Sequence, residues 1–306
     1  MTETGALLIL HGKQALNEDV RAAVARWRDE GHELAVRVTW EAGDAQRLVN
    51  EALAAGYRTL IAGGGDGSLQ EVAKALLQSG VEADLAVMPL GTANDFARAA
   101  GIPLEPYEAL RLLETPPVHV DIGEMNGQPF LNMATGGFGS KVTASTSEDL
   151  KRMLGGGAYL LTGLSRFAEI RSTPGRFHGA DFAWEGEFLA LGIGNGRQAG
   201  GGQELCPQAL LDDGLLDICI IPAAEDTVGT LGTLLSGGLL GVDAVAVTAR
   251  LAWLEVEAPE DIDINLDGEP LTAQKMRFTA RSRALWLHLP ADCPMLSGAP
   301  ISQRSG

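Results

Sequence analysis

The sequence predicts two domains, an α/β domain built on a parallel sheet and a β-sandwich that follows it. A chain of 306 residues, 45% of them hydrophobic, is long enough for two domains that each bury a core. Residues 1–122 alternate short apolar strand patterns with helical patterns. From Gln128 to about Pro290 the pattern changes to β-rich runs separated by turn residues, which is typical of a sandwich. We therefore expect domains at residues 1–124 and 125–290.

The first elements of the α/β domain are two strands and a helix. Glu33–Trp40 has a strand pattern that ends near Thr39, just before a turn, and Tyr57–Ala62 is the next apolar run. The residues Gly-Gly-Asp-Gly-Ser-Leu follow at positions 64–69. From Leu69 onward, apolar residues recur at the spacing of one helix face. The order is therefore strand, glycine turn, helix.

The glycine turn predicts a phosphate site, because unpaired backbone N–H groups at a helix N-terminus attract anions. Asp66 stands where the anion should bind, so a divalent cation, usually magnesium, is expected between the carboxylate and the phosphate. The alternative is a tight turn with an aspartate near the helix cap, since a lone glycine turn is a weak signal. No Gly-Lys-Ser/Thr follows as in a Walker A loop, and Gln70 replaces the third glycine of a dinucleotide fingerprint.

A second strand, turn and helix follow about one βα unit later. Leu85–Leu90 is a buried-strand run, Gly91–Asp95 is the turn, and Phe96 begins the helix pattern. Because parallel strands place their carboxyl ends at one edge of a sheet, both turns are expected to face the same crevice. Asn94 and Asp95 could equally serve as helix caps.

The β-rich domain carries two turns of chemical interest. Asp267 and Gly268 form a hairpin signal, and the carboxylate of Glu269, which follows directly, would in isolation be a surface residue. Asp212-Asp-Gly214 is ordinary turn chemistry, although hard cations accept such carboxylates together with backbone carbonyls. The strand runs expected here are Phe130–Met133, Phe182–Trp184, Phe188–Ile193, Leu215–Ile221, Ala249–Val256, Ile262–Leu266 and Met276–Leu289.

Charge and composition exclude several classes of function. A net charge of −17 weighs against nucleic-acid binding and against passive adhesion to an anionic membrane. Six basic residues between Lys141 and Arg176 are either a docking face for anionic headgroups or a solvated helix face. Three widely spaced cysteines and the lack of a signal-peptide pattern favour the cytosol. Thr227–Val247 is apolar but interrupted by glycines, which favours a buried helix hairpin over a membrane span.

Taken together, the motifs resemble the diacylglycerol kinase family, most closely its small bacterial YegS-type lipid kinases. The resemblance covers nearly the whole chain, and the combination of the first two motifs is the most specific part of it. Ser68 stands where most members have threonine, and Leu10–Lys13 departs from the usual first loop. The matching segments are Gly64–Glu71, Pro89–Arg98, Asn132–Gly139, Gly194–Gly202, Pro207–Leu216 and Asn265–Pro270.

The resemblance implies a Rossmann-like three-layer α/β domain of the NAD kinase and diacylglycerol kinase type, with a C-terminal tail, about residues 291–306, packed back on it. It implies that Glu269 is the general base and that Asp66 and Asp95 hold the phosphate-bridging metal. It also implies a magnesium site made by Leu210, Asp213 and Leu215, the leucines contributing carbonyl oxygens. The implied nucleotide contacts are Thr39, Gly65, Asp66, Gly67, Ser68, Leu69, Gln70, Glu71, Thr92, Asn94 and Asp95.

The function implied is an ATP-dependent lipid kinase that uses Mg²⁺, or Ca²⁺ in its place, and phosphorylates the free hydroxyl of a membrane glycerolipid. Phosphatidylglycerol is the first candidate and diacylglycerol the second. Such an enzyme would be cytoplasmic and would touch the inner membrane surface transiently. A soluble-substrate kinase of the NAD kinase type is the alternative, and Pro89–Arg98 argues against it. A third hypothesis is a non-catalytic lipid-binding regulator. The presence of both Asp66 and Glu269 argues against it.

Overall fold

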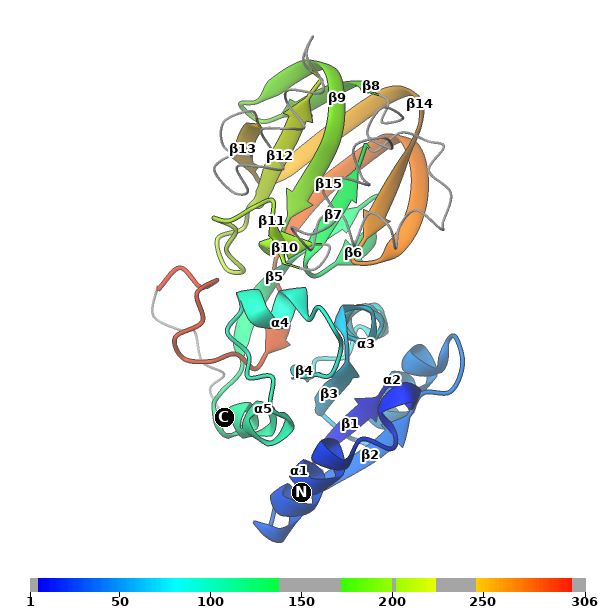
Figure 1. The fold of residues 1–306 in the computed structure, drawn as a ribbon, viewed down its shortest axis with the longest axis vertical. Helices are drawn as coiled ribbons and strands as arrows, with labels where there is room; N and C mark the ends of the chain where they lie inside the picture. Colours follow the sequence, from blue (N-terminus) through cyan, green and yellow to red (C-terminus); the bar gives the residue numbers. More distant parts are fainter. Residues whose placement is uncertain (1–4, 138–171, 200–201, 224–245, 299–306) are drawn as a thin grey trace, which may run out of the picture. The chain divides into compact units, whose positions relative to one another are not determined.

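The structure is a computed structural model that describes residues 5–137, 172–199, 202–223 and 246–298 (Figure 1). The chain forms two compact units. The first comprises Met1–Asp121 and Ser282–Gly306, and the second comprises Ile122–Arg281. The chain leaves the first unit within strand β5 (Val118–Met125) and returns to it within strand β15 (Glu269–Leu287).

The first unit is built on a parallel sheet. Its strands are β1 (Ala6–Leu10), β2 (Leu34–Val38), β3 (Thr59–Gly64) and β4 (Asp84–Pro89), and they lie in the order β4-β3-β1-β2. Leu7 is in register with Leu60 on one side and Ala35 on the other. The last residues of β15 add a further parallel pair beside β4. Because all these strands run the same way, their carboxyl ends share one edge.

Helices cover both faces of this sheet. They are α1 (Glu18–Asp29), α2 (Asp44–Ala54), α3 (Asp66–Ser79), α4 (Asp95–Ala99) and α5 (Pro106–Arg111), with short 3-10 turns η1 (Gly12–Gln14) and η2 (Leu112–Glu114). Leu8 and Leu10 of β1 pack in one core cluster with Trp27 of α1 and Leu110 of α5. Helices α2 and α3 pack against each other and against β1 and β3. Alternate residues of the buried strands therefore face opposite helical layers.

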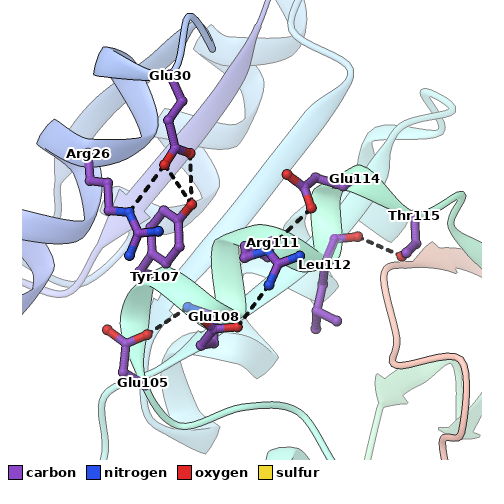
Figure 2. A network of polar contacts seen from close by, with 9 residues as sticks. All are labelled: Arg26, Glu30, Glu105, Tyr107, Glu108, Arg111, Leu112, Glu114 and Thr115. Atoms are coloured by element: carbon purple, nitrogen blue, oxygen red, sulfur yellow. Dashed lines mark hydrogen bonds and ion pairs between the residues drawn. The ribbon is translucent and has the colours of Figure 1, made fainter.

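A polar network links α1 to α5 (Figure 2). The Tyr107 hydroxyl contacts both carboxylate oxygens of Glu30, at 2.8 and 2.7 Å, and the Arg26 guanidinium lies 3.5 Å from the centre of the Tyr107 ring. The Tyr107 hydrogen bond is the main cause that lowers the pKa of Glu30, and Arg26 adds to it. The Tyr107–Glu30 hydrogen bonds join the end of α1 to the start of α5, whereas the exposed Arg26–Glu30 pair contributes little to stability.

The second unit consists of strands in its described residues. They are the parts of β5 and β15 that belong to it, with β6 (Gln128–Phe130), β7 (Met133–Gly136), β8 (Thr173–Gly179), β9 (Ala183–Gly194), β10 (Gln198–Ala199), β11 (Gln203–Glu204), β12 (Leu216–Pro222), β13 (Val247–Leu251) and β14 (Trp253–Leu266). The long strands β9 and β14 both pair with β8 at one end and with β7 at the other. Phe177, Phe188 and Phe278 lie at the centre of its core. The predicted fold class, α/β followed by a β-sandwich, is confirmed.

Several predicted strand runs of the second unit are wrong in extent. Phe182–Trp184 and Phe188–Ile193 are parts of one strand, β9, and Met276–Leu289 covers the end of β15, which begins at Glu269. The run Ala249–Val256 is divided at Ala252 between β13 and β14, and β14 then continues through to Leu266. The polar, mostly exposed stretch 258–261 had masked this continuity, because the sheet passes through it as an irregularity in the β14–β15 register. The basic segment, apart from Arg176, and most of Thr227–Val247 lie outside the described residues. No described helix is long and apolar enough to cross a membrane.

Candidate functional site

At the carboxyl edge of the first unit's sheet, the loops after β2, β1 and β3 touch one another. The Thr39 N–H donates to the Leu10 carbonyl at 3.0 Å, and the His11 N–H donates to the Gly63 carbonyl at 2.7 Å. A β-carbon at position 12 would lie 2.4 Å from the Thr39 carbonyl oxygen, so Gly12 permits the close approach of the first two loops.

The loops after β3 and β4 are joined even more closely. The Leu90 N–H donates to the Gly64 carbonyl at 2.7 Å. Gly65 and Gly91 approach backbone to backbone, since a β-carbon on Gly91 would lie 2.5 Å from the Gly65 α-carbon. Neither position tolerates a side chain without displacing the other loop. The four loops therefore form one continuous surface along the sheet edge.

Helix α3 begins at this surface with donors available to an anion. Gly65 is its N-cap and provides no side-chain cap hydrogen bond. The first N–H groups of a helix have no acceptor within it, whereas the Leu69 N–H already donates to the Gly65 carbonyl at 3.1 Å. A β-carbon on Gly64 would overlap the Ser68 side chain, so the Ser68 hydroxyl lies directly over the turn. Residues 65–68 thus offer the N–H groups, a hydroxyl and the helix dipole that phosphate binding requires.

The Asp66 side chain joins the turn after β3 to the turn after β4. One of its carboxylate oxygens accepts a hydrogen bond from the Asp95 N–H and the other from the Phe96 N–H, both at 3.1 Å. The carboxylate is thus compensated by the N-terminus of α4, thirty residues along the chain. Two backbone N–H groups, and not a cation alone, therefore make this carboxylate tolerable in the turn. A small cavity of about 10 Å³ adjoins Asp66, Gly65 and Asn94, and its volume suits a single water-sized occupant.

The remaining predicted nucleotide contacts divide into turn-forming, exposed and buried residues. Asn94, at φ 51°, accepts from the Gly91 N–H at 2.9 Å and donates to its carbonyl at 2.8 Å, so its side chain shapes the turn. Thr92 and Glu71 are exposed, and Asp95 is buried. The side chains of Leu69 and Gln70 are 4% and 3% exposed and belong to the core. Leu69 and Gln70 therefore offer a nucleotide backbone atoms only.

In the second unit, Asp267 organises a cluster that sequence reasoning missed. Its carboxylate accepts from three consecutive backbone N–H groups, those of Leu131 at 2.6 Å, Asn132 at 3.1 Å and Met133 at 2.7 Å. The Asp267 N–H donates back to the Met133 carbonyl at 3.1 Å. This aspartate has φ 48°, in the left-handed region, as the hairpin turn requires. Glu269, half-buried, begins β15 immediately after this anchored turn.

The segment around Asn195 completes the same cluster. Its side-chain amide donates to the Leu131 carbonyl at 2.7 Å, and the N–H groups of Asn195 and Gly196 donate to the Asn132 carbonyl at 3.0 and 2.6 Å. A β-carbon on Gly196 would lie 2.1 Å from the Asn132 side-chain oxygen, so only glycine fits there. Three motifs that are far apart in sequence, near residues 132, 195 and 267, therefore meet at one place.

The predicted metal loop places its carboxylate against an arginine. One Asp213 oxygen accepts from the Leu215 N–H at 3.0 Å, and the other is paired with the Arg250 guanidinium, which also lies 3.3 Å from Asp217. Burial raises the pKa of Asp217, and Arg250 opposes that rise. No group of three or more histidine, cysteine or acidic residues that could hold a metal occurs in the described part of the chain. Because the positively charged Arg250 guanidinium is paired with Asp213, the loop fits a cation only if Arg250 moves away.

Comparison with known proteins decides the family. The model of the diacylglycerol kinase catalytic domain matches residues 5–125, and that of the YegS C-terminal NAD kinase β-sandwich-like domain matches residues 133–289. The chain belongs to the diacylglycerol kinase family. A protein of Pseudomonas aeruginosa strain PAO1 named "Probable lipid kinase YegS-like" is 66% identical over 300 residues, 98% of this chain and 99% of its own. One of the same name from Pseudomonas syringae pv. syringae is 64% identical over 304 residues, 99% of each chain.

Solved structures share the fold of this family member. Two crystal structures of proteins from Bacillus anthracis strain Sterne superpose with TM-scores of 0.80 and 0.71, at 24% and 21% identity. They cover 96% of this chain and 98% and 99% of their own, and the second is described as a diacylglycerol kinase. The family membership makes the chain an enzyme, a lipid kinase, and confirms the resemblance inferred from its motifs.

One prediction for this family member concerns Asp267. Asp267→Asn keeps a residue that tolerates the left-handed turn but removes the charge and one of the two acceptor oxygens, so at least one N–H group of residues 131–133 loses its partner. We expect a loss of about 2–3 kcal/mol in the free energy of unfolding, measured by urea denaturation. Asp263→Asn, at an exposed position of the same hairpin, is the control and should change it by less than about 0.5 kcal/mol. Equal losses in the two variants would show that the three hydrogen bonds carry no special weight.

A second prediction concerns the loop around Asp213. If the loop binds magnesium, as the resemblance implies, Asp213→Ala should remove that binding, and Asp212→Ala should affect it much less. Leu215→Ile should leave it intact, because the backbone oxygen persists. Arg250→Gln should tighten binding about fivefold, since the guanidinium and the cation compete for one carboxylate and such a pair is worth up to about 1 kcal/mol. Calorimetric titration with magnesium measures all four, and equal losses in Asp212→Ala and Asp213→Ala would contradict the assignment.

Proposed function

We propose that the sheet edge of the first unit binds the phosphates of ATP together with a divalent cation, and that the phosphoryl acceptor is the free hydroxyl of a membrane glycerolipid. The observation that carries the donor site is the continuous surface of the four loops, with the free N–H groups of residues 66–68 at its centre. Of the two candidate acceptors, phosphatidylglycerol comes first and diacylglycerol second, by the family resemblance.

The proposed roles follow from what each group offers. Residues 65–68 bind phosphate oxygens through N–H groups and the Ser68 hydroxyl, and Thr39 and Thr92 lie on the same edge. Asp66 and Asp95 would hold a Mg²⁺ ion, which when bound would neutralise charge on the phosphates; Ca²⁺ is the substitute to test. The cavity beside Asp66 supports a small occupant there. Asp66 would at the same time keep its two hydrogen bonds to the second turn, which couples the two loops.

The proposed acceptor chemistry rests on Glu269. A lipid hydroxyl attacks the γ-phosphorus in line, and the Glu269 carboxylate takes its proton. Glu269 is supported by the Asp267 turn, whose three hydrogen bonds to residues 131–133 hold the start of β15 in one conformation. Rigid support of this kind is what a general base needs to keep its geometry. The enzyme would work in the cytoplasm, with transient contact at the inner membrane surface.

A phosphotransfer assay tests the proposal. Labelled ATP is incubated with the protein and mixed micelles that contain phosphatidylglycerol, diacylglycerol or neither, with soluble NAD as a further acceptor. Label should enter the phosphatidylglycerol lipid fraction and should stop when the divalent cation is chelated. Transfer to NAD alone would favour a soluble-substrate kinase. Binding of lipid without any transfer would favour a non-catalytic regulator.

A further inference from the structure

A strongly exposed aromatic side chain lies at the β2 end of the proposed nucleotide edge. Among the described residues, the large hydrophobic side chains with the greatest exposure are Trp40 at 92%, Leu16 at 79% and Val38 at 42%. Val38 is the last residue of β2, Trp40 lies two residues beyond it, and Leu16 lies in the segment between η1 and α1. A tryptophan left almost wholly in water gains nothing for folding, so the Trp40 ring is available to contact a ligand at this edge.

Hydrogen bonds hold the backbone at Trp40, whereas the indole ring is exposed. Asp44, 6% exposed, accepts from the Trp40 N–H at 2.6 Å and from the Glu41 N–H at 3.1 Å through one oxygen, while Arg47 donates to the other at 2.6 Å. These bonds, with Arg47 foremost, lower the pKa of Asp44 to about 2, so the carboxylate stays charged at neutral pH. The Thr39 N–H, one residue earlier, is bound to the Leu10 carbonyl. The loop thus presents the indole from a fixed position.

The position matches the far end of a nucleotide. β2 stands two strands from β3 in the order β4-β3-β1-β2, and adjacent strands are about 4.8 Å apart, so Trp40 lies about 10 Å along the edge from the phosphate turn. On the β4 side, the Gly91 backbone lies against Gly65 and the Asp66 carboxylate is bonded to the second turn, and the cavity of about 10 Å³ between these turns is too small for a base. A nucleoside whose phosphates occupy residues 65–68 therefore extends toward β1 and β2.

We propose that Trp40 is the stacking platform for the purine base of the nucleotide, and this rests on the proposed donor site. The indole offers a flat π surface for the base, and a loop anchored by Asp44 spares the ordering cost on binding. Stacking on an aromatic ring is indifferent to the exocyclic groups of the base, so Trp40 contributes affinity for purine nucleotides and little choice between them.

The test compares two probes on three proteins. Equilibrium dissociation constants for Mg-ATP and for Mg-tripolyphosphate, which has no base, are measured with the wild type, Trp40→Ala and Val81→Ala. Val81 is an exposed apolar residue of the same unit, between α3 and β4, at the other end of the strands. A stacked base is worth about 1–3 kcal/mol, so Trp40→Ala should weaken ATP about 5- to 150-fold. Tripolyphosphate should bind Trp40→Ala as it binds the wild type, and Val81→Ala should match the wild type with both probes.

A fluorescence measurement gives an independent readout. ATP, but not tripolyphosphate, should protect the exposed Trp40 of the wild type from quenching by acrylamide. Unchanged ATP affinity in Trp40→Ala would overturn the proposal, as would equal losses for both probes. Weaker binding of that variant to phosphatidylglycerol vesicles, with normal ATP affinity, would overturn it in favour of a membrane anchor. If the wild type bound neither probe, the donor site itself would be refuted, and that outcome is distinct from a failure of the stacking role.

Discussion

Asp66→Asn should lower the phosphotransfer rate by about 10²-fold or more at ordinary magnesium concentrations. A bridging cation supplies several kcal/mol of charge stabilisation to the reacting phosphates, and an amide holds such a cation poorly. The rate is measured with labelled ATP and lipid micelles at saturating substrate. A turnover close to that of the wild type would contradict the role in metal binding.

The structure adds a cost in stability to the same variant. An asparagine has one acceptor oxygen for the two N–H groups of Asp95 and Phe96, so one buried donor is left without its partner. We expect a loss of about 1–3 kcal/mol in the free energy of unfolding. Asn94→Gly is the matched comparison, because glycine tolerates its positive φ while the two hydrogen bonds to Gly91 are lost. If rate and stability fell in proportion in both variants, Asp66 would be a turn-positioning residue and not a metal ligand.

Glu269→Gln should lower the rate by roughly 10²–10⁴-fold, because it keeps the shape of the side chain but cannot accept the hydroxyl proton. Affinity for ATP should change little, since the residue is proposed to act on the lipid. Glu260→Gln controls for the loss of charge, because it removes one exposed carboxylate from the preceding strand of the hairpin. This variant should keep full activity. A variant that lost ATP binding but kept its rate per bound ATP would show that Glu269 serves the nucleotide instead.

The elements of the first unit could be read from the sequence because their signals are local. Apolar residues at strand and helix spacing predicted β2, β3, β4 and α3, and the two glycine turns predicted where α3 and α4 begin. The same reasoning gave the shared sheet edge, since parallel strands leave no other arrangement for their carboxyl ends. In the second unit, strands predicted from apolar runs were too short, because pairing with neighbouring strands carries β14 and β15 through polar stretches that no local pattern marks.

Only the tertiary structure decided which groups are the partners of the charged side chains. The Asp66 carboxylate binds N–H groups about thirty residues away, Asp267 binds a segment more than 130 residues earlier in the chain, and Asp213 meets Arg250 on another strand. A residue type and its spacing predict that a carboxylate is present in a turn. They do not predict which donors reach it, because a hydrogen bond acts over about 3 Å and the fold alone brings such distant donors within that range. The sequence by itself therefore determined the family and its motifs, and the fold determined which of those motifs hold one another in place.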